Sequence, residues 1–153
     1  MPLNVRIKKL VSEAKIPTYA HDTDMGMDIY CTSREYDKDL DRYIYHTGLA
    51  FEVPEGYGML IFPRSSNTKK EVYLANSVGI LDSGYRGELM FIYKDRTHRL
   101  TMPRYASSPV FPYEVGDRIG QIVIIPYPKI NFIESDSLEK TDRGEGGFGS
   151  TGK

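Results

Sequence analysis

The stretch Leu49-Ala50-Phe51-Glu52-Val53-Pro54-Glu55-Gly56 decides the fold class of this chain. Its leucine, phenylalanine and valine alternate with other residues before a Pro-Glu-Gly turn. A period of two places side chains on one face of a β-strand, and proline with glycine ends the strand in a turn. Similar runs occur at residues 3–7 and 89–93, and residues 122–125 form an apolar run that predicts a strand buried on both faces. Short strands and frequent turns predict an all-β sandwich, barrel or jelly roll.

Only one helix is predicted, and it is short. Ser66 or Asn67 would cap it, and it would span Thr68 to Leu74. Residues 34–41 are highly charged and residues 94–113 contain three prolines, so both are expected to be surface excursions.

At 153 residues the chain fits one domain, spanning residues 1–153, and one site. A net charge of -1 gives no overall attraction to nucleic acid or an anionic membrane, so neither is an expected partner. The single cysteine, Cys31, is interpreted as a small buried residue rather than a nucleophile, because no paired base is apparent beside it. No apolar run reaches the roughly 20 residues that span a bilayer. These features favour a soluble, intracellular protein of the cytoplasm or nucleus.

Residues 134–153 are polar and then glycine-rich, which predicts a flexible C-terminal arm. The arm ends in the letters RGEGGFGSTGK, residues 143–153, which partly match a dinucleotide fingerprint and a P-loop. Both matches are rejected. A fingerprint needs a strand, a helix and an acidic residue about 20 positions later, and a P-loop needs a hydroxyl residue after its lysine.

The chemistry of residues 143–153 nevertheless suits a nucleotide. Backbone N–H groups of the glycines, the Arg143 guanidinium and the hydroxyls of Ser150 and Thr151 would bind phosphate, and Phe148 offers a flat face to a base. The alternative is a flexible glycine-rich segment without a ligand.

Four further segments carry polar groups. They are Ala20–Ile29 with Asp22, Asp24 and Asp28; Phe62–Asn67 with Arg64, Ser65 and Ser66; Asn76–Gly87 with Asp82 and Tyr85; and Gly116–Gln121 with Asp117, Arg118 and Gln121. Each alone has a simpler interpretation, such as a helix cap or a turn. In this order and spacing, however, the five segments resemble the five signature motifs of the trimeric dUTPase family. The resemblance runs from about Ala20 to the last residue.

The resemblance implies an antiparallel jelly roll with one short helix, of the dUTPase-like β-clip type. It implies a homotrimer in which the arm, about residues 134–153, is exchanged and closes over a neighbouring active site. The implied reaction is hydrolysis of dUTP to dUMP and pyrophosphate with Mg²⁺, through attack of water on the α-phosphorus. Such a reaction limits uracil incorporation into DNA and supplies dUMP for dTMP synthesis. The sequence leaves open whether a virus or phage encodes the protein.

The resemblance also assigns the site. Asp82 would be the general base, for which an ionised carboxylate within hydrogen-bond reach of the water suffices, and Asp28 would hold Mg²⁺ through water. The implied substrate-binding residues are Arg64, Ser65, Ser66 and Gln121 at the phosphates; Asn76 and Gly79 at the uracil edge; Tyr85 beneath the deoxyribose; and Arg143, Phe148, Gly149, Ser150 and Thr151 in the closing arm. Asp22 and Asp24 have weaker claims. Asp117 and Arg118 could equally form a turn and an ion pair, and Arg86 is expected to be structural.

The chain departs from the family at three positions. Met27 stands where an aromatic residue or leucine is more usual, Gly84 where an acidic residue is common, and Gly120 where alanine is usual. Two other functions are considered. One is the related dCTP deaminase, disfavoured by Asp82, Tyr85 and the arm; the other is a regulatory module that binds nucleotide without catalysis.

Overall fold

The computed structural model describes residues 2–96 and 109–147. In this part of the chain, nine strands and one short 3₁₀ helix alternate with turns. The elements are β1 (Arg6–Lys9), β2 (Met27–Tyr30), β3 (Ser33–Asp37), β4 (Arg42–Glu52), β5 (Tyr57–Phe62), η1 (Ser65–Lys69), β6 (Val72–Leu74), β7 (Gly79–Leu81), β8 (Glu88–Asp95) and β9 (Arg118–Pro126). None of the helical structure described is long and apolar enough to cross a membrane.

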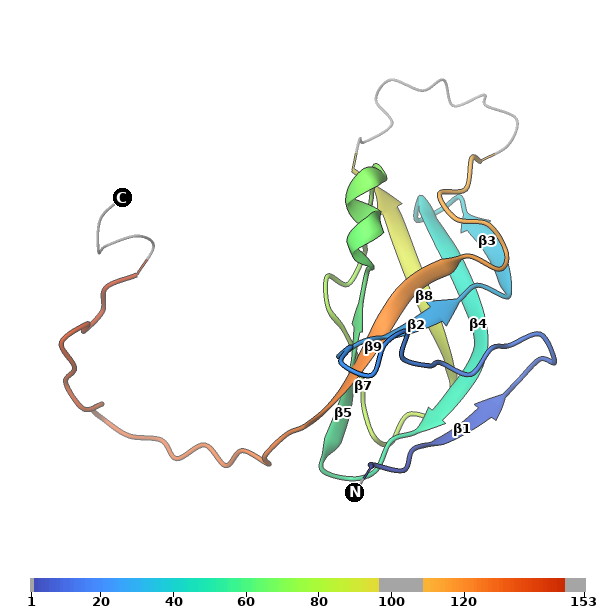
Figure 1. Ribbon diagram of the computed structural model, residues 1–153. Helices are drawn as coiled ribbons and strands as arrows, with labels where there is room; N and C mark the ends of the chain where they lie inside the picture. The colour runs from blue at the N-terminus through green and yellow to red at the C-terminus, as the bar shows by residue number, and fades with distance from the viewer. Residues whose placement is uncertain (1, 97–108, 148–153) are drawn as a thin grey trace.

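The strands form two sheets, visible in Figure 1, whose neighbouring strands all run antiparallel. The first has the order β1-β4-β8-β6, with β3 also paired to β4; the second has the order β2-β9-β5-β7. The all-β fold class predicted from the alternating runs is confirmed, and so is the antiparallel arrangement that the family resemblance implied. In this order, β6 is an edge strand of the first sheet and β7 is an edge strand of the second.

Three of the four predicted strands are present in the expected places. Residues 49–52 end β4, residues 89–93 lie in β8 and residues 122–125 lie in β9. The first run was placed too early, because the strand at the N-terminus begins at Arg6. Burial on both faces holds for Ile122 and Val123, but the next two residues are half-buried.

The helix prediction was wrong in its bounds. The helix spans Ser65–Lys69, Arg64 is its N-cap, and no side chain caps it. Residues 72–74 instead form β6, because they pair with β8 and bury two side chains in the core. Tertiary pairing with β8 supplies backbone hydrogen bonds that local propensity cannot foresee.

The predicted excursion at residues 34–41 is partly wrong. Its first half belongs to β3, which pairs with β4, and only the turn before Arg42 protrudes. The second excursion was predicted to begin at residue 94, but β8 continues to Asp95. Residues 97–108 lie outside the described residues. From residue 127 onward the described chain has no strand, and Figure 1 shows it leaving the two sheets.

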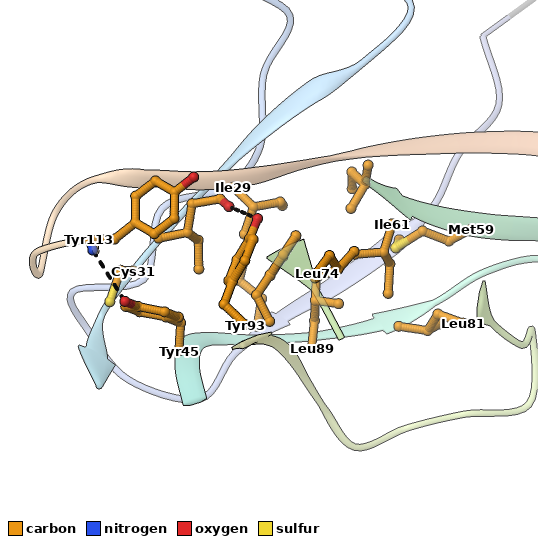
Figure 2. Close-up of a cluster of buried hydrophobic side chains, with 14 of the residues drawn as sticks. Ile29, Cys31, Tyr45, Met59, Ile61, Leu74, Leu81, Leu89, Tyr93 and Tyr113 are labelled. Carbon is orange, nitrogen blue, oxygen red and sulfur yellow. Dashed lines mark hydrogen bonds between the residues drawn. The ribbon is translucent and has the colours of Figure 1, made fainter. Parts of the chain in front are cut away.

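The core lies between the sheets and is rich in tyrosine. Figure 2 shows Tyr45, Tyr93 and Tyr113 beside aliphatic residues from both sheets. The Tyr93 hydroxyl donates to the backbone oxygen of Ile119 at 2.6 Å, which joins β8 to β9 across the core. Burial raises the pKa of the Cys31 thiol to about 11. Cys31 is thus a buried, protonated core residue, as expected.

The departure at Gly120 has a packing explanation. A Cβ at this position would lie 1.9 Å from Cε1 of Phe91 and 2.5 Å from its Cζ. Phe91 is fully buried in the facing sheet. The phenylalanine ring therefore fills the space that an alanine methyl group would need.

Candidate active site

One polar cluster of the site is built around Asp28 in β2. Its Oδ1 accepts from Nε of Arg64 at 2.6 Å, and its Oδ2 accepts from Nη1 of Arg118 at 2.9 Å. The aspartate and Arg64 are largely buried, with side-chain exposures of 19% and 23%. Two arginines thus share one carboxylate, which leaves the cluster with a net positive charge. Such a cluster suits an anionic ligand.

The register of β2, β9 and β5 brings Gln121 and the segment before Arg64 to this cluster. Asp28 pairs with Gln121, which also pairs with Phe62 just before Arg64. The Gln121 amide donates to the backbone oxygen of Pro63 at 3.0 Å. A Cβ on Gly26 would lie 2.5 Å from Gln121 Oε1, so the glycine leaves space for this side chain.

Helix η1 carries the two serines. The Ser66 hydroxyl accepts from Nη1 of Arg64 at 3.2 Å, and the Ser65 side chain is exposed. Arg64 therefore connects the carboxylate of β2 with the hydroxyls of η1. The structure brings together Asp28, Arg64, Ser66 and Gln121, the residues to which the family resemblance assigns the metal ion and the phosphates.

The donor set around Asp28 fits magnesium bound through water. No group of three or more His, Cys, Asp or Glu side chains that could hold a metal occurs among the described residues. Mg²⁺ keeps several waters and is often bound by one or two carboxylates together with substrate phosphates. Each carboxylate oxygen of Asp28 has one arginine partner and can accept a further hydrogen bond from a metal-bound water.

A second cluster lies on the segment from Asn76 to Gly87. It begins with a turn in which Ser77 adopts a φ of 59°, a left-handed conformation that is uncommon outside glycine. Strand β7 follows and pairs with β5, so its other edge faces away from the described sheet. Edge strands present backbone N–H and C=O groups to a ligand. A Cβ on Gly79 would lie 2.7 Å from the Asn76 amide nitrogen, so the glycine lets that side chain lie against β7.

Asp82 and Tyr85 follow β7 in one turn, closed by a hydrogen bond of 3.0 Å from the Tyr85 N–H to the Asp82 backbone oxygen. The Asp82 side chain is exposed, and both residues line a hollow of about 210 Å³. The Tyr85 hydroxyl donates to the backbone oxygen of Glu88 at 3.1 Å. Its ring covers Gly87, where a Cβ would lie 2.3 Å from the hydroxyl oxygen. The absence of a side chain at Gly87 thus leaves the space in which the tyrosine ring lies.

Within one chain, the two clusters lie at different positions along strand β5. Gln121 pairs with Phe62, whereas Leu81, just before Asp82, pairs with Met59. Three residues along a strand correspond to about 10 Å, and Asp82 lies one residue further. The described part of the arm, up to residue 147, also extends away from the two sheets (Figure 1). Arg143 is exposed, and its Nε donates to the backbone oxygen of Gly146 at 2.9 Å.

Other predicted residues are either not described by the structure or lie in an exposed turn. Phe148, Gly149, Ser150 and Thr151 lie outside the described residues. Asp24 accepts from the N–H of His21 in an exposed turn, and Asp22 is exposed.

The structure also shows the contacts of Asp117 and Arg118, for which two roles were left open, and of Arg86, which was expected to be structural. Asp117 accepts from the N–H of Glu114 at 2.8 Å in a turn. Arg86 donates to the backbone oxygens of Ser83 and Tyr85, which supports its structural role. Arg118 forms the ion pair that the sequence left open. No local spacing in the sequence could have revealed this pair, because 90 residues separate Asp28 and Arg118.

The fold and these clusters are typical of an all-β protein that binds an anionic nucleotide. Comparison with known proteins narrows the class. A family profile described as dUTPase matches residues 12–152. Deoxyuridine 5'-triphosphate nucleotidohydrolase of Clostridium tetani is 38% identical over 150 residues, covering 97% of each chain. The corresponding protein of Hydrogenobaculum sp. is 36% identical over 152 residues, covering 98% of this chain and 99% of that one.

A solved structure shows the same fold. It is that of Staphylococcus bacteriophage 80alpha dUTPase with dUPNHPP, at a TM-score of 0.77 and 27% identity, covering 98% of this chain and 99% of that chain. The chain belongs to the dUTPase family, and the predicted jelly-roll fold of that family is confirmed.

Proposed function

We propose that this protein hydrolyses dUTP to dUMP and pyrophosphate. The family profile and the relatives named as deoxyuridine 5'-triphosphate nucleotidohydrolases support this reaction. The observation that carries it within the structure is the Asp28–Arg64–Arg118 cluster, because it gathers positive charge beside the serines of η1. A chain of phosphates is the part of dUTP that such a cluster would bind.

The phosphate chain would be held by Arg64, Ser65, Ser66 and Gln121. Binding Arg64 to phosphate does not require loss of its contact with Asp28, because a guanidinium has five N–H donors. Its fork would donate to phosphate oxygens while Nε stays on the carboxylate. Held in this way, the α-phosphorus has a fixed orientation toward the attacking water.

At the nucleoside end, the edge of β7 at Gly79 and the Asn76 amide would read uracil by hydrogen bonds. Tyr85, with 45% of its surface exposed, would pack beneath the deoxyribose and leave no room for a 2′-hydroxyl. Asp82 would accept a proton from water as the water oxygen bonds to the α-phosphorus. The bond from that phosphorus to the bridging oxygen breaks, and pyrophosphate leaves.

Enzymes of the dUTPase family generally use Mg²⁺. In this chain Asp28 would hold the ion through water, and bound magnesium would neutralise charge on the phosphates. The arm residues Arg143, Phe148, Gly149, Ser150 and Thr151 would close over the nucleotide and exclude other water.

The functional unit is proposed to be a homotrimer with shared active sites. The separation of Asp82 from the Arg64 cluster supports this, because two copies can supply what one chain holds apart. Several large apolar side chains near β6, β7 and β8 are exposed and would be covered by a neighbour: Tyr73 at 42%, Val78 at 43%, Ile80 at 70% and Met90 at 40%.

The arm supports an exchange between subunits. Ile130, Phe132 and Ile133, just before the arm, are 66%, 92% and 85% exposed, and Leu138 within it is 89% exposed. An apolar groove of about 390 Å³, formed by the N-terminal segment with Met27, Phe51, Ile122 and Ile124, offers a surface for such side chains. The arm of one subunit would anchor on a neighbour in this way and reach that neighbour's site.

The test is pyrophosphate release from dUTP, dTTP, dCTP and UTP by the purified protein, with magnesium or with EDTA. We expect cleavage of dUTP alone, dependent on magnesium. Conversion of dCTP to a uracil nucleotide with dUTP untouched would instead identify a deaminase. Binding of dUTP without cleavage would identify a regulatory module.

A further inference from the structure

A buried hydrogen-bonded chain joins η1 to the segment that leads into β9. Asn67 is the buried residue of η1, with 5% of its surface exposed. Its Nδ2 donates to the backbone oxygen of Val72 at 3.0 Å, and its Oδ1 accepts from the Tyr113 hydroxyl at 2.8 Å. Both ends of the amide are therefore occupied by partners from different parts of the fold.

Tyr113 is itself held firmly by the core. It is 3% exposed, and its ring meets Tyr45 edge-on, with centroids 5.6 Å apart at 89°. Its backbone N–H donates to the Tyr45 hydroxyl at 3.2 Å. Burial raises the pKa of the Tyr113 phenol, so the hydroxyl stays a neutral donor. Figure 2 shows Tyr113 beside Tyr45 in the buried cluster.

Helix η1 depends on such contacts for its position. It is one short 3₁₀ element with no side-chain cap at Arg64, and elements of this length have little stability of their own. Just beyond its end, Nζ of Lys70 donates to the backbone oxygen of Pro112 at 2.5 Å and lies 4.4 Å from the Tyr113 ring centroid. The segment at residues 112–113 thus contacts η1 at Asn67 and the C-cap of η1 at Lys70.

We propose that Asn67 and Tyr113 are positioning residues for the phosphate subsite. Asn67 directly follows Ser65 and Ser66, so the bond from Tyr113 to Asn67 sets where the two hydroxyls lie relative to Arg64. The inference rests on the proposed function, in which these serines bind the phosphates of dUTP. Removing the Tyr113 hydroxyl frees η1 to shift, and small displacements of positioning groups are costly for binding and catalysis.

The matched variants are Tyr113→Phe and Tyr43→Phe. Each removes one hydroxyl from a buried tyrosine, but the Tyr43 hydroxyl donates to Asp95 at 3.2 Å rather than to η1. Calorimetric titration with inorganic tripolyphosphate and magnesium isolates the phosphate subsite from uracil recognition. We expect the affinity of Tyr113→Phe to fall about three- to tenfold and that of Tyr43→Phe to match wild type. The KM for dUTP should rise in parallel.

A double-mutant cycle shows whether the hydroxyl acts through Asn67. If it does, Asn67→Ala weakens tripolyphosphate binding, and adding Tyr113→Phe to it has little further effect. Equal affinities for Tyr113→Phe and Tyr43→Phe, or additive effects in the cycle, would overturn the inference. Failure of wild type to bind tripolyphosphate or cleave dUTP would overturn the proposed function instead.

Discussion

Asp82 is the residue on which the proposed chemistry depends most directly. Its exposed carboxylate lies in a turn that is closed by Tyr85 and borders the hollow beside β7. Asp82→Asn keeps the size of the side chain but removes the proton acceptor. We expect turnover to fall about 10²- to 10⁴-fold while dUTP still binds. Pyrophosphate release and calorimetry measure the two properties, with exposed Asp39→Asn as control. Near-normal turnover would remove Asp82 from the base role.

Gly87 is a second decisive residue, through its contact with Tyr85. A methyl group there would displace the phenol, because the hydroxyl oxygen would lie 2.3 Å from the new Cβ. We expect Gly87→Ala to lower the preference for dUTP over UTP about tenfold or more. The measurement is the ratio of kcat/KM for the two nucleotides.

Gly84→Ala is the matched control for Gly87→Ala, because it changes the same turn but a Cβ at Gly84 meets nothing within 4 Å. An unchanged preference in both variants would contradict the assignment of Tyr85 to the deoxyribose.

At the scale of elements, β9 connects the site with the core. Gln121 and Arg118 on this strand reach the cluster around Asp28, whereas Ile119 and Ile122 are buried in the core. Gly120 lies between them, opposite the ring of Phe91. A change that distorts β9 therefore affects stability and site together.

Gly120→Ala tests this packing. The added methyl group overpacks the core against Phe91, and we expect unfolding free energy to fall by about 1–3 kcal/mol. Urea unfolding followed by tyrosine fluorescence measures the change. In a Phe91→Leu background the cost should largely disappear, because the ring is gone.

The control for Gly120→Ala is Gly58→Ala in the paired strand β5, where a Cβ would have an ordinary contact of 3.5 Å with Tyr127. Equal destabilisation by the two alanines would contradict the explanation from Phe91.

At the scale of the whole molecule, the proposed trimer makes a site from several chains. Asp82→Asn and Arg64→Ala would each be inactive alone. If these residues come from different subunits, each contributing subunit of an equal mixture has the intact residue in about half of the cases. Random co-assembly therefore completes about a quarter of the sites. Co-expression of the two variants and assay of the mixed trimers should recover about that share of wild-type activity. If mixtures stay inactive, the two residues belong to one chain and the shared-site proposal fails.

The sequence by itself determined the fold class, and its resemblance to a family named most of the residues that the structure gathers around Asp28. Alternating runs such as residues 49–53 predict strands because the side-chain period of a strand is a local property. The segments around Arg64 and Gln121 had no clear meaning alone, and they were assigned to a site only because the five segments together resemble the family's motifs.

The tertiary structure decided what depends on contacts between distant segments. Residues 72–74 became a strand because β8 lies beside them, and Arg118 reached Asp28 through the pairing of β2 with β9. The bond from Tyr113 to Asn67 joins residues 46 apart. Local propensity carries no signal for such contacts, because their energy comes from groups that only the folded chain brings together.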